Sequence, residues 1–204
     1  HYPLADPITV LPRSVQQPSP PISVAAFSRP TVEFAAENGF DVIFAPFAAA
    51  MMFGSLENAV GEFKEIAAKS GYADSKAICS YFFGLADSAA EERAIKERLL
   101  FYLQSITSAF PDDIKTAPPH IAYFVDIVNT LLSMKPEDLG TRSIVTGNAD
   151  RVTEHLKTVE AAGISEVILY FNMGAYPHVN TMKMMERFWA SQTNFTGLDS
   201  LDWD

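Results

Sequence analysis

The stretch ISVAAFSRPT, residues 22–31, contains the change of backbone conformation that the rest of the chain repeats. Its first part, Ile22–Phe27, is apolar, which indicates a short buried strand. Ser28-Arg29-Pro30-Thr31 places a hydroxyl residue before a proline in the first turn, the pattern of a helix start. We predict that this helix continues to Glu37 and ends at Asn38-Gly39, a common helix C-terminus. The stretch therefore predicts a strand that leads directly into a helix.

The same order of strand and helix returns further along the chain. Three more apolar runs are predicted strands: Asp41–Phe47, Ala77–Ala86 and Val167–Asn172. Helices are predicted from Ser55 to near Gly71, from Ser88 onward, from Asn148 to Gly163 and from Val179 to Ser191. These strands show little alternation of polar and apolar residues, and such strands between helices indicate parallel strands buried on both faces. A doubly wound sheet and a barrel both satisfy the pattern, and four strands would make half of an eight-stranded barrel of roughly 250 residues.

Three segments lie outside this alternation. Residues 1–21 are rich in proline and are predicted to be an extended lead-in. Residues 110–140 are predicted to be a helical insertion with a helix over His120–Ser133, and residues 193–204 form an acidic tail. We therefore predict one domain over residues 22–192.

Composition and charge exclude several classes of protein. The net charge of -10 argues against nucleic-acid binding, because affinity for a phosphate backbone is built from Lys and Arg. The longest apolar stretches are far shorter than the roughly 20 residues that span a bilayer, so we expect no membrane insertion. Cys79 is the only cysteine, which excludes an internal disulfide and a cysteine-based metal site. We expect a cytoplasmic protein without a metal.

Several motifs, taken in order, resemble one enzyme family. PRSVQQPSPPI, residues 12–22, is similar to the segment Pro-Arg-Pro-Val-Gln-x-Pro-His-Pro-Pro-Ile of luciferase-like flavin-dependent monooxygenases, the superfamily of bacterial luciferase. Residues 24–28 and 34–39 continue the resemblance, as do residues 144–152 and 162–174 near the end of the barrel. The chain departs from the family at several positions: Ser14, Ser19, Phe27 and Asn148-Ala149. These departures weaken the inference about substrate more than the inference about fold.

The resemblance implies a fold and an activity. The fold would be α/β, a partial (β/α)8 TIM barrel with approximately strands 5–8, their helices and the inserted segment. The complete enzyme would use reduced FMN, supplied by a separate flavin reductase, to insert one oxygen atom into an organic substrate. The chain would then be a C-terminal fragment, inactive without the N-terminal half. The family's catalytic histidine and cysteine come from that first half, so no catalytic residue is assigned.

The first candidate site is the junction of the strand and helix at Ser28. Backbone N–H groups and the helix dipole make such a junction favourable for an anion. The resemblance places the flavin phosphate on backbone groups of Ala26, Phe27 and Ser28 and on the hydroxyls of Ser28 and Thr31, with added charge from Arg29. From the residues alone, the alternative is that Ser28 is a plain N-cap.

The second candidate site follows the last predicted strand, where barrel enzymes place their substrates. Met173, Tyr176 and His178 are the predicted substrate pocket, with His178 orienting the substrate. The alternative is a loop histidine beside a methionine-rich core helix. His120 and His155 lie on predicted helices without a matching ligand partner, and no metal-site spacing is present.

Two alternatives to the monooxygenase remain. One is a non-catalytic, shortened barrel relative that binds flavin or forms dimers. The other is a deazaflavin-dependent oxidoreductase of the same superfamily. Half a barrel would expose edge strands and one face of its sheet, so we expect a homo-oligomer or pairing with the missing half.

Overall fold

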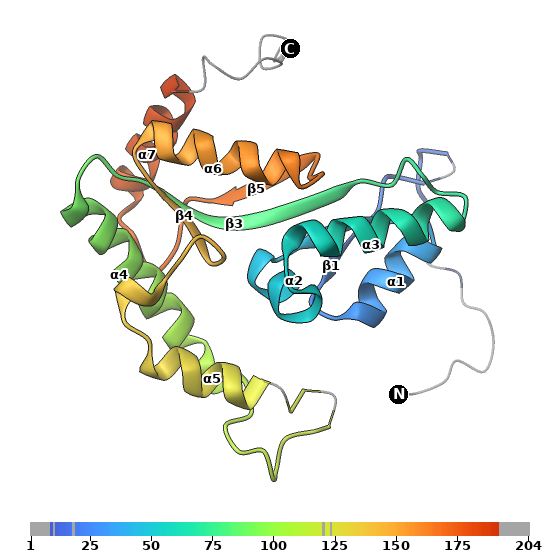
Figure 1. Cartoon of the computed structure of the whole chain (residues 1–204), viewed down its shortest axis with the longest axis horizontal. Coiled ribbons are helices and arrows are strands. Elements are labelled where there is room, and N and C mark those ends of the chain that lie inside the picture. Colours follow the sequence, from blue (N-terminus) through green and yellow to red (C-terminus); the bar gives the residue numbers. More distant parts are fainter. Residues whose placement is uncertain (1–8, 10, 18, 120, 123, 192–204) are drawn as a thin grey trace.

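The computed structural model describes residues 9, 11–17, 19–119, 121–122 and 124–191, which form one parallel sheet with surrounding helices (Figure 1). The strands of this part of the chain are β1 (Ser23–Ala26), β2 (Asp41–Phe44), β3 (Ala77–Leu85), β4 (Ile144–Gly147) and β5 (Glu166–Tyr170). β2 lies between β1 and the first residues of β3, and β4 pairs with the last residues of β3. The register of β5 on β3 overlaps those of β2 and β4, so β5 lies on the opposite edge. All pairs are parallel, which confirms the α/β prediction.

The helices begin where the sequence provides caps. The α-helices of the described residues are α1 (Arg29–Glu37), α2 (Pro46–Phe53), α3 (Leu56–Lys69), α4 (Ala89–Ser105), α5 (Phe124–Ser133), α6 (Ala149–Ala161) and α7 (His178–Ser191). The side chains of Ser55, Ser88 and Asn148 accept backbone N–H groups at the starts of α3, α4 and α6, as predicted. None of these helices is both long and apolar enough to cross a membrane.

Two local predictions were wrong. The second strand ends at Phe44 instead of Phe47, because Pro46 starts α2: its fixed φ suits the first helical turn and it has no N–H for strand pairing. Ile144–Gly147 was not among the predicted strands but forms β4. This strand has only four residues and is recognisable only through its partner, the long β3.

The two faces of the sheet differ. The closed face contains Cys79, Tyr81 and Phe83, and the rings of Phe171 and Phe188 lie 4.7 and 4.8 Å from that of Phe83. The open face contains residues that alternate with these, and there the register pairs Ser80 with Ile168 and Phe82 with Tyr170. Ile168 is 38% exposed and Tyr170 is 47% exposed. The prediction of strands buried on both faces therefore holds for only one face among the described residues.

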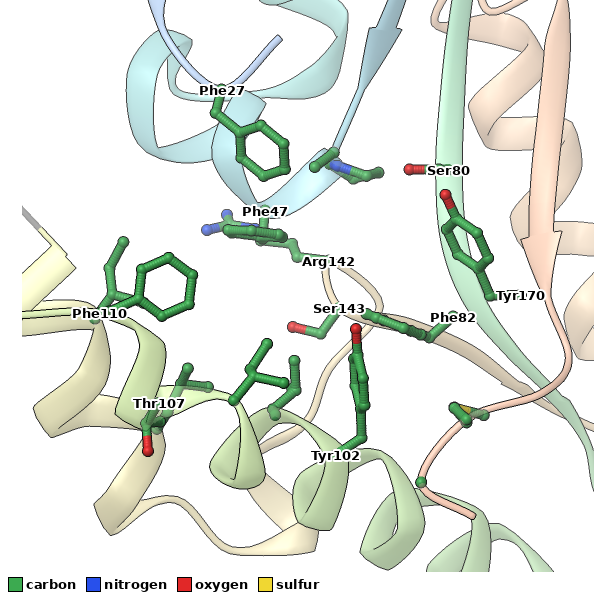
Figure 2. A pocket seen from close by; sticks show the side chains of 18 of the residues that line it. Phe27, Phe47, Ser80, Phe82, Tyr102, Thr107, Phe110, Arg142, Ser143 and Tyr170 are labelled. Carbon is green, nitrogen blue, oxygen red and sulfur yellow. The ribbon is translucent and has the colours of Figure 1, made fainter. Parts of the chain in front are cut away.

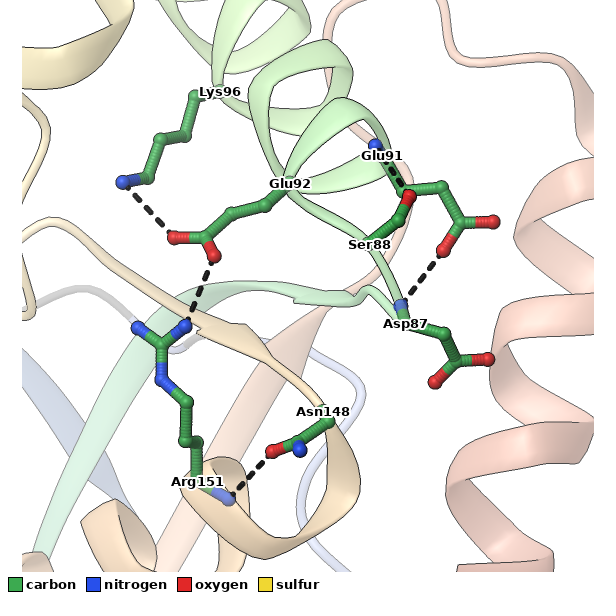
Figure 3. Close-up of polar contacts among 7 residues, drawn as sticks. All are labelled: Asp87, Ser88, Glu91, Glu92, Lys96, Asn148 and Arg151. Carbon is green, nitrogen blue, oxygen red and sulfur yellow. Dashed lines mark hydrogen bonds and ion pairs between the residues drawn. The ribbon is translucent and has the colours of Figure 1, made fainter.

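A partly buried glutamate on α4, Glu92, forms an ion pair with Arg151 on α6 (Figure 3). Glu92, whose side chain is 18% exposed, lies 3.1 Å from Lys96 Nζ and 3.0 Å from Arg151 Nη1. Within α4, Glu92 pairs with Lys96 and Arg93 pairs with Glu97, each four residues apart. The contact with Arg151, however, is 59 residues away in the chain. This ion pair is a contact between α4 and α6.

Candidate functional site

A cavity of about 920 Å³ opens on the open face at the C-terminal ends of the strands (Figure 2). Phe27 follows β1, Pro46 and Phe47 follow β2, and residues 172–175 follow β5. α4 and α5 form the opposite wall, with Tyr102 and Phe124 among its residues. This is the edge at which barrel enzymes bind their ligands.

Aromatic rings dominate the walls of the cavity. The ring centroid of Phe82 is 5.7 Å from those of both Tyr102 and Tyr170. Phe27 and Phe47 form a second pair, at 6.0 Å, and Phe110 stacks on Phe124 at 4.5 Å. Such walls favour a planar, largely apolar ligand.

Polar groups are sparse in this cavity. Ser80, Ser143, Tyr102 and Tyr170 contribute hydroxyls that have no hydrogen-bond partner among the described residues. In Figure 2 the Tyr170 hydroxyl points toward Ser80 and the Tyr102 hydroxyl lies near Ser143. Arg142 is the one charged side chain among the described residues that line the cavity. A few polar groups in an apolar pocket are the pattern of a small-molecule site, because they fix the orientation of the ligand.

The start of α1 borders the cavity through Phe27. Ser28 is the N-cap residue, in extended conformation, but its side chain makes no cap hydrogen bond. Its Oγ lies 2.9 Å from Oγ1 of Thr31 instead. Two hydroxyls are therefore side by side at the positive end of the helix dipole, an arrangement that suits an anion.

The donor set at this junction fits a phosphate group in part. Pro30 has no N–H, and Thr31 N–H donates to the Ser28 carbonyl at 3.1 Å. The N–H of Arg29, at the first helical position, has no carbonyl partner within the helix. The Arg29 guanidinium is paired with Glu62 and lies 4.4 Å from the centroid of the Phe53 ring, so its charge is already partnered. The hydroxyls and the Arg29 N–H are the groups that fit an anion.

The predicted site residues are only partly brought together. Ala26 is buried at the end of β1, and Phe27 and Met173 line the cavity. Tyr176 packs against the hydrophobic core, and His178 is exposed at the first position of α7. Neither residue is among those that line the cavity. His120 lies outside the described residues.

His155 lies on the closed face of the sheet. Its ring packs edge-on against Tyr81, with centroids 5.4 Å apart, and its Nε2 is buried without a partner among the described residues. Burial lowers the pKa of His155. It lines a smaller cavity of about 200 Å³ together with Tyr81 and Arg142.

The sequence did not single out most of the cavity wall. Phe110 and α5 belong to the segment interpreted as an excursion from the alternating pattern, yet they line the cavity. Arg142 lies directly after that segment and has no motif around it. Residues 124–133 lie between prolines and have apolar residues at helical spacing. This amphipathic pattern was the one signal in the sequence that the segment packs against another part of the protein.

The chain is similar in structure to several solved oxidoreductases. No protein-family model and no curated protein matches the chain. Monooxygenase RslO1 from Streptomyces bottropensis has a TM-score of 0.63 and 20% identity over 91% of this chain and 51% of its own. The FMN complex of the oxygenating constituent of 3,6-diketocamphane monooxygenase from Pseudomonas putida has a TM-score of 0.50 and 19% identity, over 74% and 42%. An F420-dependent secondary alcohol dehydrogenase has a TM-score of 0.50 and 14% identity, over 73% and 42%.

These similarities establish the fold. The chain spans about half the length of the solved structures it matches. Its parallel strands, with a cavity at their C-terminal ends, agree with the barrel that the sequence motifs implied. The chain therefore shares the fold of part of these solved monooxygenases, as part of a (β/α)8 barrel.

Proposed function

We propose that the chain is the FMN-binding later half of a reduced-flavin-dependent monooxygenase. The observation that carries this proposal is the Ser28–Thr31 hydroxyl pair, 2.9 Å apart at the start of α1, where the preceding residue Phe27 lines the cavity. The similarity in fold to a monooxygenase solved with FMN supports the choice of cofactor. A separate flavin reductase would supply the reduced cofactor.

The residues of the chain have separate roles in this proposal. Ser28 and Thr31 donate their hydroxyl hydrogens to the phosphate, and the Arg29 N–H adds a third donor. The aromatic walls, with Phe82 and Tyr170 among them, bind the flat ring and exclude water. Reduced FMN supplies the electrons with which molecular oxygen is split, one atom entering the substrate and the other leaving as water. Met173 contacts the substrate, whereas Tyr176 and His178 do not line the cavity.

Features of the open face favour a partner that covers it. β1 and β5 each pair with one neighbour in the described part of the chain, which leaves an edge of each strand free. Ile168 and Tyr170, on the open face of β5, are exposed. Exposed edges and apolar surface favour association. We propose that an N-terminal half-barrel or a second subunit covers this face, and light scattering that shows only monomers of the 204-residue chain would exclude self-association.

A deazaflavin-dependent oxidoreductase is the second candidate. The similarity to an F420-dependent alcohol dehydrogenase supports it. The two candidates are separated by titrating the protein with FMN and with F420, because the preferred cofactor binds more tightly. A protein that binds neither cofactor would favour the non-catalytic, dimerising alternative.

Binding of FMN and riboflavin to the 204-residue chain tests the leading proposal. The two ligands differ by the phosphate, so FMN is expected to bind at least about tenfold more tightly, the effect of one charge-assisted hydrogen bond. The variants Ser28→Ala and Thr31→Val should lower FMN affinity toward that of riboflavin and leave riboflavin affinity unchanged. Flavin fluorescence gives both constants.

Ser88→Ala is the matched control for this titration. It removes the hydroxyl of a true N-cap, at the start of α4, and this hydroxyl is bonded to the Glu91 N–H away from the cavity. Its FMN affinity should equal that of the wild type. Equal affinity of the wild type for FMN and riboflavin would overturn the assignment of the phosphate to α1.

A further inference from the structure

Arg142 is an arginine without a partner in an acidic protein. The chain has 25 Asp and Glu residues against 15 Lys and Arg. Four other arginines of the described residues hold a carboxylate: Arg29, Arg93, Arg151 and Arg187. No acidic side chain of the described residues pairs with Arg142, although acidic residues outnumber basic ones.

Arg142 is exposed and borders the largely apolar cavity. The residue lies in the turn that precedes β4, and its side chain reaches into the cavity on the side of Phe47 (Figure 2). The described residues that line the cavity include no Asp, Glu or Lys. Ser143, the next residue, adds a hydroxyl to the same wall. Arg142 is exposed, and the aromatic side chains on its cavity side exclude part of the surrounding water, which strengthens its attraction for an anion.

The chemistry of the wall defines a class of ligand. A guanidinium presents its N–H groups as a planar fork that matches both oxygens of a carboxylate. The rest of the wall is aromatic and aliphatic and suits an apolar body. We propose that the cavity binds an organic acid, with its carboxylate on Arg142 and Ser143 and its apolar body against Phe110 and Phe124. Arg142 is then the residue that selects acids over neutral analogues.

This assignment names the substrate class of the proposed oxygenase. The claim that an organic acid is the substrate rests on the proposed oxygenase function, whereas the claim that the cavity binds an organic acid does not. The flavin phosphate is another anion that would suit a guanidinium. The hydroxyl pair at Ser28 already provides for that phosphate, so we assign Arg142 to the substrate.

The test compares 2-naphthoate with 2-naphthalenemethanol by calorimetry, on the 204-residue protein without flavin. These probes share a planar apolar body and differ in charge. The wild type should bind the naphthoate about tenfold more tightly, the effect of one charge-assisted contact. Arg142→Gln should abolish this preference and leave the affinity for the alcohol unchanged, whereas Arg142→Lys should retain part of it. Equal binding of the two probes by the wild type, or no binding of the naphthoate, would overturn the proposal.

Arg98→Gln is the matched control. Arg98 is exposed on α4, forms no ion pair among the described residues and does not line the cavity. Its replacement should leave both probe affinities unchanged. An equal loss of naphthoate affinity in Arg98→Gln and Arg142→Gln would mean that the preference comes from the overall charge of the protein and would contradict the proposal. A titration with FMN and riboflavin separates the two anions. If Arg142→Gln weakened FMN alone and left the naphthoate unchanged, Arg142 would hold the flavin phosphate and the organic-acid assignment would be wrong.

Discussion

The two faces of β3 are made of alternating residues of one strand, yet they have opposite environments. Cys79, Tyr81 and Phe83 pack under helices, and Cys79 and Phe83 have no exposed surface. Ser80 and Phe82 line a cavity that Arg142 and a few hydroxyls make partly polar. Because successive side chains of a strand point to opposite faces, a single strand serves both stability and binding. Substitutions on the closed face should therefore affect folding, and substitutions on the open face should affect ligands.

Replacing each of the neighbouring residues Phe82 and Phe83 by alanine should give the largest difference in the free energy of unfolding. Phe83→Ala leaves a void among Phe171, Phe188 and the core, and should lower the free energy of unfolding by about 3–5 kcal/mol. Phe82→Ala removes a half-buried ring that borders the cavity, so its cost should be near 1 kcal/mol. Urea unfolding measures both, and Phe83→Leu provides a milder variant if Phe83→Ala does not fold. Equal losses at the two positions would contradict the difference between the faces.

A glycine at the rim of the cavity should be the next most sensitive position. Gly174 has a φ of 58°, and a Cβ there would overlap the carbonyl oxygen of Arg98 on α4. Gly174→Ala should therefore destabilise the protein by about 1–3 kcal/mol and displace the wall next to Met173. Gly61→Ala is the control, since Gly61 lies within α3 with open space around it and should gain up to about 1 kcal/mol. Thermal unfolding of both variants distinguishes the close approach from a general effect of alanine.

The buried ring of His155 should make the closed face sensitive to acid. Burial lowers the pKa of His155 in the folded state, whereas the unfolded chain keeps the ordinary value of 6.5. Below that ordinary value the unfolded state takes up a proton that the folded state does not, so stability should decrease as the pH falls from 6.5 toward the lowered pKa. His155→Gln should remove this part of the pH dependence in urea unfolding between pH 5 and 8. An unchanged slope in the variant would mean that His155 is not the titrating group.

The ion pair between α4 and α6 should have the smallest effect. Burial raises the pKa of Glu92, but hydrogen bonds and charges of Lys96 and Arg151 outweigh burial and lower it. This contribution to stability is present above the ordinary carboxyl pKa and is lost as the pH falls below it. Arg151 is 62% exposed, so Glu92→Gln should cost less than about 1 kcal/mol. A double-mutant cycle with Arg151→Gln at low and high salt measures the coupling, and a coupling that salt does not reduce would contradict an electrostatic contact.

The order of strands and helices could be predicted because it is encoded locally. Caps such as Ser55 and Asn148 and apolar runs such as Ala77–Leu85 are visible in the sequence without tertiary information. The boundary at Pro46 and the short strand β4 were missed because each depends on a neighbouring segment. A short apolar run is equally compatible with a turn or a helix approach until its partner strand is known.

The site was harder to predict than the fold. Ser28 and Thr31 could be named because a strand leads directly into a helix there, and the motif matched a family. Arg142 and Phe110 reach the cavity from a segment without a motif, through contacts between residues far apart in the chain. Nor does residue order reveal that Arg142 lacks an acidic partner. That property depends on which side chains the fold brings together.

The most direct test of the account is the reactivity of thiols on adjacent positions of β3. Cys79 has no exposed surface and burial raises its pKa to about 12, so in the wild type it should react with a thiol reagent only on unfolding. In the double variant Cys79→Ala, Ser80→Cys, the new thiol faces the cavity and should react rapidly in the folded protein. FMN should slow this reaction by occupying the cavity, and a thiol that is as unreactive as Cys79, or that FMN does not protect, would contradict the account.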